Sequence, residues 1–248
     1  MNARTQDEIT GMSRAGRAVR KAFVAMRRAA RVGMTTGELD EIGAQVLKAQ
    51  GANSAPQLYY DFPGATCISV NEEAAHGIPG ERVLAAGDLV NIDVSAELEG
   101  FVADMGESFV LEPDGRHEDK VRICQAVQSA VRAALAEARA GHSLNVIGRA
   151  VQKVADRTGY RIVENLGSHG VGRSIHEEPS YVPFDNPREK RKLTEGMVLT
   201  IEPFFSTAAR WVEEQADGWT LAVPDDSLVA QYEHTLIVTT GRPIVVTA

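Results

Sequence analysis

The chain has 248 residues, of which 44% are hydrophobic and 24% charged, a composition typical of a globular protein. Its 34 acidic and 26 basic residues give a net charge of -8, which argues against nucleic acid as the main partner. The only cysteines, Cys67 and Cys124, cannot form a disulfide framework. Because the N-terminal segment is polar and no apolar run is long enough to span a membrane, we expect a cytoplasmic protein.

Apolar side chains recur at helical spacing over residues 7–31, and Gly33 ends this first predicted helix. Thr35 and Glu38 form a capping-box pattern that opens a second helix, which runs to about Gln50 and is closed by glycine. Two strand-like runs follow, at residues 67–70 and 89–94.

The same order recurs later in the chain. A helix is predicted over residues 118–140, Ser143 caps the next one, and Gly141 and Gly159 lie 108 residues after Gly33 and Gly51. Strand-like runs again follow, at residues 197–201 and 234–239. The pattern predicts one domain, residues 1–248, built from two related halves of roughly 7–112 and 118–248. Chance is the alternative, since helices that end in glycine are common.

An acidic hairpin is predicted where residues 89–95, which contain Asp93, turn back into residues 101–111, which contain Asp104. With a turn at Leu98-Glu99, Asp93 would lie directly opposite Asp104, with Cβ atoms about 4.5–5.5 Å apart. A turn centred on Glu99-Gly100 would instead place them on different faces. Two adjacent carboxylates repel unless cations lie between them, and a pair of divalent metals fits this gap. Solvated aspartates are disfavoured because the hairpin is rich in Val, Ile and Phe.

Three more segments supply candidate metal ligands. His169 lies in a glycine-rich segment, Glu202 ends an apolar strand, and Glu233 begins another. One imidazole with four carboxylates forms a hard donor set that suits a pair of Mn²⁺, Fe²⁺, Co²⁺ or Zn²⁺ ions. Each residue taken singly is more often an ordinary surface or hydrogen-bonded group, so the prediction rests on the ensemble.

Six sequence blocks in order resemble the type I methionine aminopeptidases of the short bacterial kind. They are HGIP at 76–79, NIDV at 91–94, HGVG at 169–172 with HEEP at 176–179, TIEP at 200–203, DGWT at 217–220 and QYEHT at 231–235. The resemblance implies an α+β "pita-bread" fold, in which two pseudo-symmetric halves surround a central dimetal site. It also implies hydrolysis of the N-terminal methionine from nascent proteins and peptides whose second residue is small, by a water that bridges two metals.

The resemblance assigns roles to individual residues. It implies that Asp93 chelates one metal, that Asp104 and Glu233 bridge both, and that His169 and Glu202 complete the other. Glu202 would also act as general base, and the catalytic histidines His76 and His176 would contact the peptide. The methionine pocket would comprise Tyr59, Phe62, Cys67, His76, Ile175 and Trp219.

Three positions depart from the family pattern, namely Met105, Ser168 and Ile175, which affects the surroundings of the ligands and the shape of the pocket. The alternatives are an Xaa-Pro aminopeptidase or prolidase and a non-catalytic module that binds peptides. Expected partners are the N-terminal peptide of a nascent protein and a transient ribosome contact, for a monomer that binds no membrane.

Overall fold

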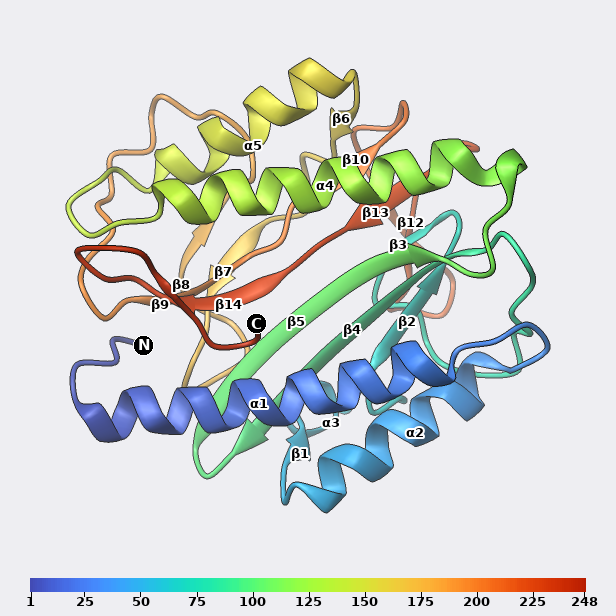
Figure 1. Ribbon diagram of the computed structural model, residues 1–248, viewed down its shortest axis with the longest axis horizontal. Coiled ribbons are helices and arrows are strands. Elements are labelled where there is room, and N and C mark those ends of the chain that lie inside the picture. The colour runs from blue at the N-terminus through green and yellow to red at the C-terminus, as the bar shows by residue number, and fades with distance from the viewer.

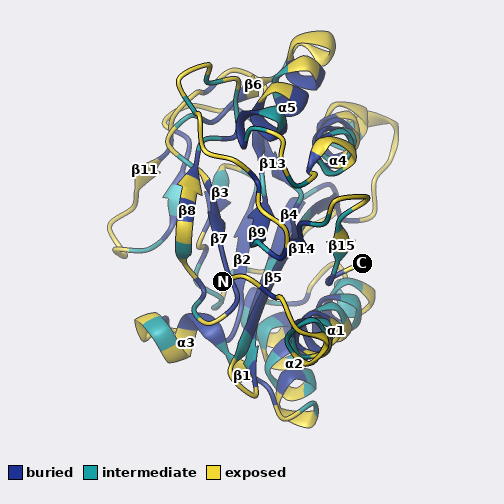
Figure 2. Ribbon diagram, turned by 90° about the vertical axis from the view of Figure 1, so that its left-hand side faces the viewer, coloured by how far each residue is buried: buried dark blue, intermediate teal, exposed yellow.

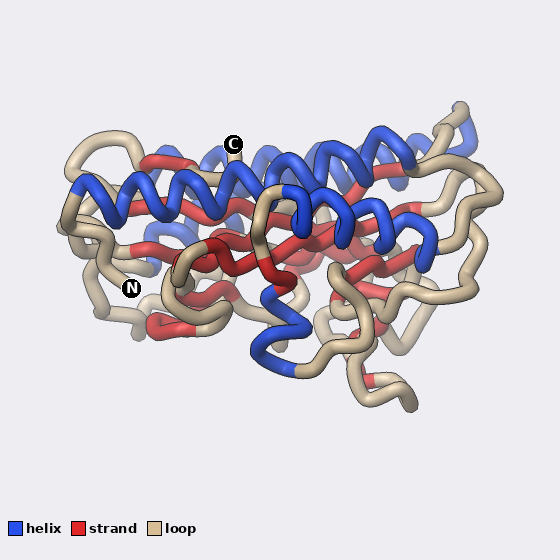
Figure 3. The backbone as a smooth tube through the Cα atoms, turned by 90° about the horizontal axis from the view of Figure 1, so that it is seen from below, coloured by secondary structure: helices blue, strands red, loops and turns tan.

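Four long helices cover one face of the protein, and strands lie beneath them (Figures 1 and 3). The computed structural model describes residues 1–248. A short helix, α3 (Ala55–Tyr60), projects on the side of the strands away from the long helices (Figure 3). The long helices are α1 (Gln6–Ala29), α2 (Thr36–Ala49), α4 (Glu118–Glu137) and α5 (Asn145–Thr158).

Each long helix of the first half begins with a capping box, and the one at α2 was predicted. Thr5 and Glu8 form a capping box at α1, and Thr35 and Glu38 form the predicted one at α2. In the second half Leu144 occupies the N-cap of α5, one residue after the predicted cap, while the Ser143 hydroxyl accepts from the Asn145 amide in the first turn at 3.4 Å. A 3-10 turn, Gly115–His117, leads into α4.

Two principal antiparallel sheets underlie the helices. The first joins β1 (Asn53–Ser54), β4 (Leu89–Leu98) and β2 (Cys67–Val70), with β5 (Phe101–Val110) paired to β4. The second has the order β15 (Ile244–Val245), β14 (His234–Ile237), β9 (Val198–Ile201), β7 (Ser168–Gly170) and β8 (Glu177–Tyr181). Two small sheets comprise β13 (Val229–Gln231), β10 (Phe204–Ser206) and β6 (Arg161–Ile162), and β11 (Glu213–Glu214), β12 (Leu221–Ala222) and β3 (Glu73–Ala75).

Strand β5 connects the two halves of the molecule. The Glu233 amide donates to the Gly106 carbonyl at 2.7 Å. The Thr235 hydroxyl accepts from the Asp104 amide at 2.9 Å and donates to the Asp104 carbonyl at 2.8 Å. The β4–β5 hairpin of the first half is therefore bonded directly to β14 of the second half and to Glu233, the residue before it.

The hydrophobic core divides along the same line. One large buried cluster contains side chains of α1 and of the β4–β5 hairpin, such as Met12 and Ile92, and the other contains side chains of α4 and β10, such as Ile123 and Phe205. Figure 2 shows the buried residues concentrated in the strand layer and on the inner faces of the helices. None of the helices combines the length and hydropathy of a membrane span. The arrangement fits two halves of similar construction, while their common origin stays a prediction.

The register of the acidic hairpin differs from the predicted one. The turn is Glu99-Gly100, and both residues have positive φ (53° and 78°), as a two-residue type I′ turn requires. Asp93 therefore pairs with Gly106, and Asp104 pairs with Ser95, so the prediction that the two aspartates face each other directly was wrong.

The prediction that this second turn would separate the aspartates was also wrong. Moving the turn from Leu98-Glu99 to Glu99-Gly100 shifts the pairing by two residues, which leaves every side chain on its original face. Asp93 and Asp104 are thus diagonal neighbours on one face of the hairpin. Because side chains alternate along a strand, Ile92 and Met105 point the other way and are buried in the first hydrophobic cluster.

Candidate active site

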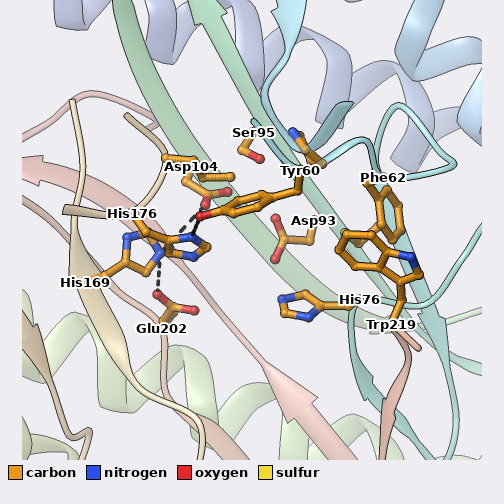
Figure 4. A pocket seen from close by; sticks show the side chains of 13 residues that line it. Tyr60, Phe62, His76, Asp93, Ser95, Asp104, His169, His176, Glu202 and Trp219 are labelled. Carbon is orange, nitrogen blue, oxygen red and sulfur yellow. Dashed lines mark hydrogen bonds and ion pairs between the residues drawn. The ribbon is translucent and has the colours of Figure 1, made fainter. Parts of the chain in front are cut away.

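A cavity of about 290 Å³ contains most of the predicted site residues. Figure 4 shows carboxylates and imidazoles toward one end of it and the rings of Phe62 and Trp219 at the other. All of the predicted site residues except Tyr59 and Glu233 line this cavity, and Pro56, Tyr60 and Ser95 line it as well.

The polar end is organised around His169. Its Nδ1 lies 2.9 Å from the Gly170 carbonyl oxygen, and since a carbonyl can only accept, Nδ1 carries the proton. The other nitrogen, Nε2, lies 3.2 Å from Oε1 of Glu202 and 4.0 Å from Oδ2 of Asp104. This arrangement is typical of a metal ligand, because a carbonyl holds Nδ1 and the lone pair of Nε2 faces carboxylates.

Glu233 belongs to the same cluster, although it does not line the cavity. Asp104, His169 and Glu233 are buried, and one donor atom from each lies within 4.8 Å of the others. Asp104 Oδ1 and Glu233 Oε1 are buried and have no hydrogen-bond partner. Leaving two carboxylate oxygens buried and unpaired is costly, and a cation removes that cost. The donor set therefore fits a divalent metal ion.

An amide network holds two of these carboxylates. Gln231 Nε2 donates to Glu233 Oε2 at 2.9 Å and reaches Asp93 Oδ2 at 3.5 Å. Asn91 Nδ2 donates to Gln231 Oε1 at 2.8 Å, which fixes the orientation of the amide. A Cβ on Gly106 would lie 2.1 Å from Gln231 Oε1, so only glycine leaves room for this side chain.

Glu202 is held by two residues of its own half. The Thr200 hydroxyl donates to Glu202 Oε1 at 2.6 Å, and the Ser168 hydroxyl accepts from the Glu202 amide at 3.1 Å. Ser168, one of the departures from the family pattern, thus fixes the backbone of Glu202. Gln231 and Thr200 lie in the predicted sequence blocks but were assigned no role, although each belongs to a strand, β13 or β9, and lies two residues before a carboxylate that follows that strand.

The carboxylates cannot all be ionised without a compensating charge. Burial raises the pKa of Asp93 to about 6 and the pKa of Glu202 to about 8. Burial and, second, the neighbouring carboxylates raise the pKa values of Asp104 and Glu233 well above their ordinary range. A bound divalent ion would reverse these shifts by favouring the ionised forms.

The metal-free protein should lose stability as the pH rises. A carboxyl group whose pKa is raised on folding stabilises the fold at low pH, and this contribution is lost as the pH rises through the folded-state pKa. For Asp93 the loss runs from its ordinary pKa of 3.8 up to about pH 6, and for Glu202 from 4.5 up to about pH 8. Above pH 6.5 the loss therefore comes from Glu202 together with Asp104 and Glu233. The melting temperature of chelator-treated protein should therefore fall by several degrees between pH 6.5 and 9, and that of metal-loaded protein should fall less. A melting temperature of the metal-free protein that is flat or rising over this window would contradict the assignment.

His76 reaches the cavity through an unusual backbone conformation. Its φ is 54°, in the left-handed region, where non-glycine residues concentrate at functional sites. The next residue, Gly77, is fixed by its amide, which donates to Ser69 Oγ at 3.1 Å, and by its carbonyl, which accepts from the Ile68 amide at 3.0 Å. In Figure 4 the His76 ring lies between the carboxylates and Trp219.

The apolar end of the cavity has a rigid wall. The rings of Phe62 and Trp219 meet edge to face, with centroids 5.2 Å apart. Cys67 is paired with Asp93 across β2 and β4, which places a buried thiol beside the carboxylates. Ile175 also lines the cavity and is buried.

Tyr59 does not line the cavity, and its neighbour Tyr60 does. The Tyr59 hydroxyl donates to the Arg173 carbonyl at 3.1 Å, and its ring packs against the first hydrophobic cluster. Adjacent residues of a helix project about 100° apart, so only one of the two tyrosines of α3 can face the cavity. The sequence showed an aromatic-rich segment here but could not orient this short helix.

Comparison with known proteins places the chain among metallopeptidases. The model of metallopeptidase family M24 matches residues 10–240. The chain is 47% identical over 247 residues to "Methionine aminopeptidase 2" of Bacillus subtilis, covering 97% of this chain and 96% of that protein.

Solved structures agree with this placement. A crystal structure of methionine aminopeptidase from Rickettsia prowazekii superposes with a TM-score of 0.94 at 30% identity, with 100% of both chains covered. Prolidase from Pyrococcus furiosus, at 22% identity and a TM-score of 0.78, shares the fold, and the match covers 99% of this chain and 65% of that one. These likenesses confirm the predicted pita-bread fold, and the chain belongs to metallopeptidase family M24.

Proposed function

We propose that this chain is a methionine aminopeptidase that removes the N-terminal methionine when the second residue is small. One observation carries the proposal: an apolar aromatic end and a buried cluster of carboxylates and imidazole meet at a single cavity. In that cluster two carboxylate oxygens lack hydrogen-bond partners. The names of the full-length relatives support it.

Asp93, Asp104, His169, Glu202 and Glu233 would hold two divalent ions drawn from Co²⁺, Mn²⁺, Fe²⁺ or Zn²⁺. Four carboxylates can neutralise two such ions, and carboxylates readily bridge metals. When bound, the ions would acidify a water molecule toward neutral pH and polarise the carbonyl of the scissile peptide bond.

The remaining chemistry falls to side chains around the cluster. Glu202, held by the Thr200 hydroxyl, would take a proton from the attacking water and pass it to the leaving amine. His176 would donate a hydrogen bond to the carbonyl oxygen as it gains negative charge. His76 would bind the scissile amide and keep it in line with the attacking water.

The apolar end of the cavity would select methionine. Phe62 and Trp219 offer flat apolar surfaces, and Cys67 adds a polarisable sulfur, which suits an unbranched thioether. The carboxylate cluster would attract the free α-amine of the peptide, so that cleavage is confined to the first residue.

The specificity predicts a clear order of substrates. Met-Ala and Met-Gly peptides should be hydrolysed faster than Met-Leu or Met-Lys peptides, because the walls beside the carboxylates crowd a bulky second side chain. The test is hydrolysis of this panel, with Co²⁺, Mn²⁺, Fe²⁺ and Zn²⁺ supplied in turn. Faster release of methionine from Met-Leu than from Met-Ala would contradict the proposal. Preferential cleavage before proline would favour the Xaa-Pro alternative, and binding without hydrolysis under every metal would favour the non-catalytic module.

We further propose that residues 1–248 act as one catalytic domain in the cytoplasm, as a monomer, on the N-terminal peptides of newly made proteins. A transient contact with the ribosome would bring the cavity to its substrate. The net charge of -8 supports a peptide rather than a nucleic acid as the main ligand.

A further inference from the structure

The ring of His176 is held by a residue that the sequence did not single out. The hydroxyl of Tyr60, the last residue of α3, lies 2.6 Å from His176 Nδ1, and the two ring centroids are 5.5 Å apart (Figure 4). On its other side the His176 ring meets the His169 ring edge to face, with centroids 4.3 Å apart. No other hydrogen bond of the protein reaches the His176 ring.

The backbone of His176 is fixed by a separate residue. Glu177 Oε1 accepts hydrogen bonds from the amides of Arg173 and Ser174, at 2.6 and 2.9 Å, and so closes the turn that leads to His176. This turn contains no helix or strand, so it sets where the Cα of His176 lies but not the rotation of its ring. The rotation depends on Tyr60.

The chemistry of the two groups decides which of them donates. A phenol gives up its proton near pH 10, whereas a neutral imidazole is a good acceptor at its unprotonated nitrogen. Burial raises the pKa of Tyr60 further, so its hydroxyl keeps the proton. At pH 8, above the ordinary pKa of histidine, the Tyr60 hydroxyl therefore donates to Nδ1, and the proton of the imidazole resides on Nε2.

We propose that Tyr60 is a positioning residue whose hydroxyl fixes the His176 ring with its Nε2–H available to the carbonyl oxygen of the bound peptide. The inference rests on the proposed function, since it gives His176 the role of hydrogen-bond donor in peptide hydrolysis. A donor held in place before the reaction has no reorganisation cost when charge develops on the oxygen. Loss of the Tyr60 hydroxyl therefore lowers kcat rather than weakening substrate binding.

The test compares Tyr60→Phe with Tyr160→Phe, a matched control because Tyr160 lies outside the cavity, where its ring packs beside that of Phe205 with centroids 6.4 Å apart. Tyr60→Phe keeps the ring that lines the cavity and is 44% exposed in the native protein, so the variant has no reason to misfold. We expect kcat on a Met-Ala peptide to fall about fivefold to tenfold, the effect of one hydrogen bond, with KM within about twofold. Tyr160→Phe should leave kcat unchanged.

The second readout is independent of activity. In full-length protein with ¹⁵N-labelled histidine, both metal-free and loaded with diamagnetic Zn²⁺, the Nδ1 signal of His176 should move toward that of an unbonded imidazole nitrogen in Tyr60→Phe only. An unmoved Nδ1 signal, or an unchanged kcat, in Tyr60→Phe overturns the inference. If the wild-type protein fails to hydrolyse Met-Ala with any metal, the proposed function fails, while the ¹⁵N comparison still decides whether Tyr60 holds His176.

Discussion

Asp104→Ala should lose bound metal and peptide hydrolysis together. Asp104 contributes a buried oxygen without a partner and lies next to both His169 and Glu233 in the cluster. Removing one of the five proposed ligands would release at least one ion, and kcat should fall at least about 10³-fold because bound divalent ions would stabilise the transition state by several kcal/mol. Metal content by mass spectrometry, measured beside kcat on a Met-Ala peptide, checks both halves of the prediction.

Neutralising the same residue should have a different effect on the metal-free protein. At pH 8 the metal-free wild-type protein holds four crowded carboxyl groups, and removing one relieves their repulsion. Metal-free Asp104→Asn, which keeps the side-chain volume, should therefore melt above metal-free wild type. Asp156→Ala, on the exposed surface of α5, serves as the control and should change neither metal content nor rate. Retention of both ions with normal turnover in Asp104→Ala would refute the assignment.

His76→Ala should keep its metals and still lose about 10²-fold in kcat. The proposed role of His76 is to bind the scissile amide, and a positioned hydrogen bond that strengthens in the transition state is worth roughly that factor. No coordination bond is removed, so metal content should equal that of wild type. Parallel measurement of metal content and kcat separates this substrate contact from a ligand.

The control for this variant is His142→Ala, because His142 is an exposed histidine whose Nδ1 contacts the Glu137 carbonyl away from the cavity. It should leave both readouts unchanged. Loss of a metal ion from His76→Ala would show that the roles of the histidines are assigned wrongly, even though the family is right.

Local signals in the sequence were sufficient to predict the helices and the chemistry of the site. Apolar spacing that ends at Gly33 placed α1, and the capping box of Thr35 and Glu38 with a closing glycine placed α2, each to within about two residues. The ligand candidates could be found because a carboxylate in an otherwise apolar strand is expensive unless it is used.

Register and helix orientation were harder to predict because they depend on small local differences. Both turns of the acidic hairpin contain Glu99, so the choice between them depended on whether Leu98 or Gly100 takes the other positive φ of a type I′ turn, and glycine takes it without strain. The choice between Tyr59 and Tyr60 depended on the rotation of a six-residue helix, which packing against the first hydrophobic cluster determines.

The supporting network could not be predicted because it connects distant parts of the chain. Asn91 bonds Gln231, and Asp104 bonds Thr235, in each case across the junction between the two halves. Such pairs leave no periodic trace in one sequence. These pairs form only when folding places the β4–β5 hairpin beside β13 and β14.

Anomalous scattering from crystals of the full chain grown with Mn²⁺ or Co²⁺ tests the central claim most directly. We expect two anomalous peaks at the cavity, bounded by the carboxylates of Asp93, Asp104, Glu202 and Glu233 and by Nε2 of His169. Fully loaded crystals with no peak beside Asp104 and Glu233 would contradict it.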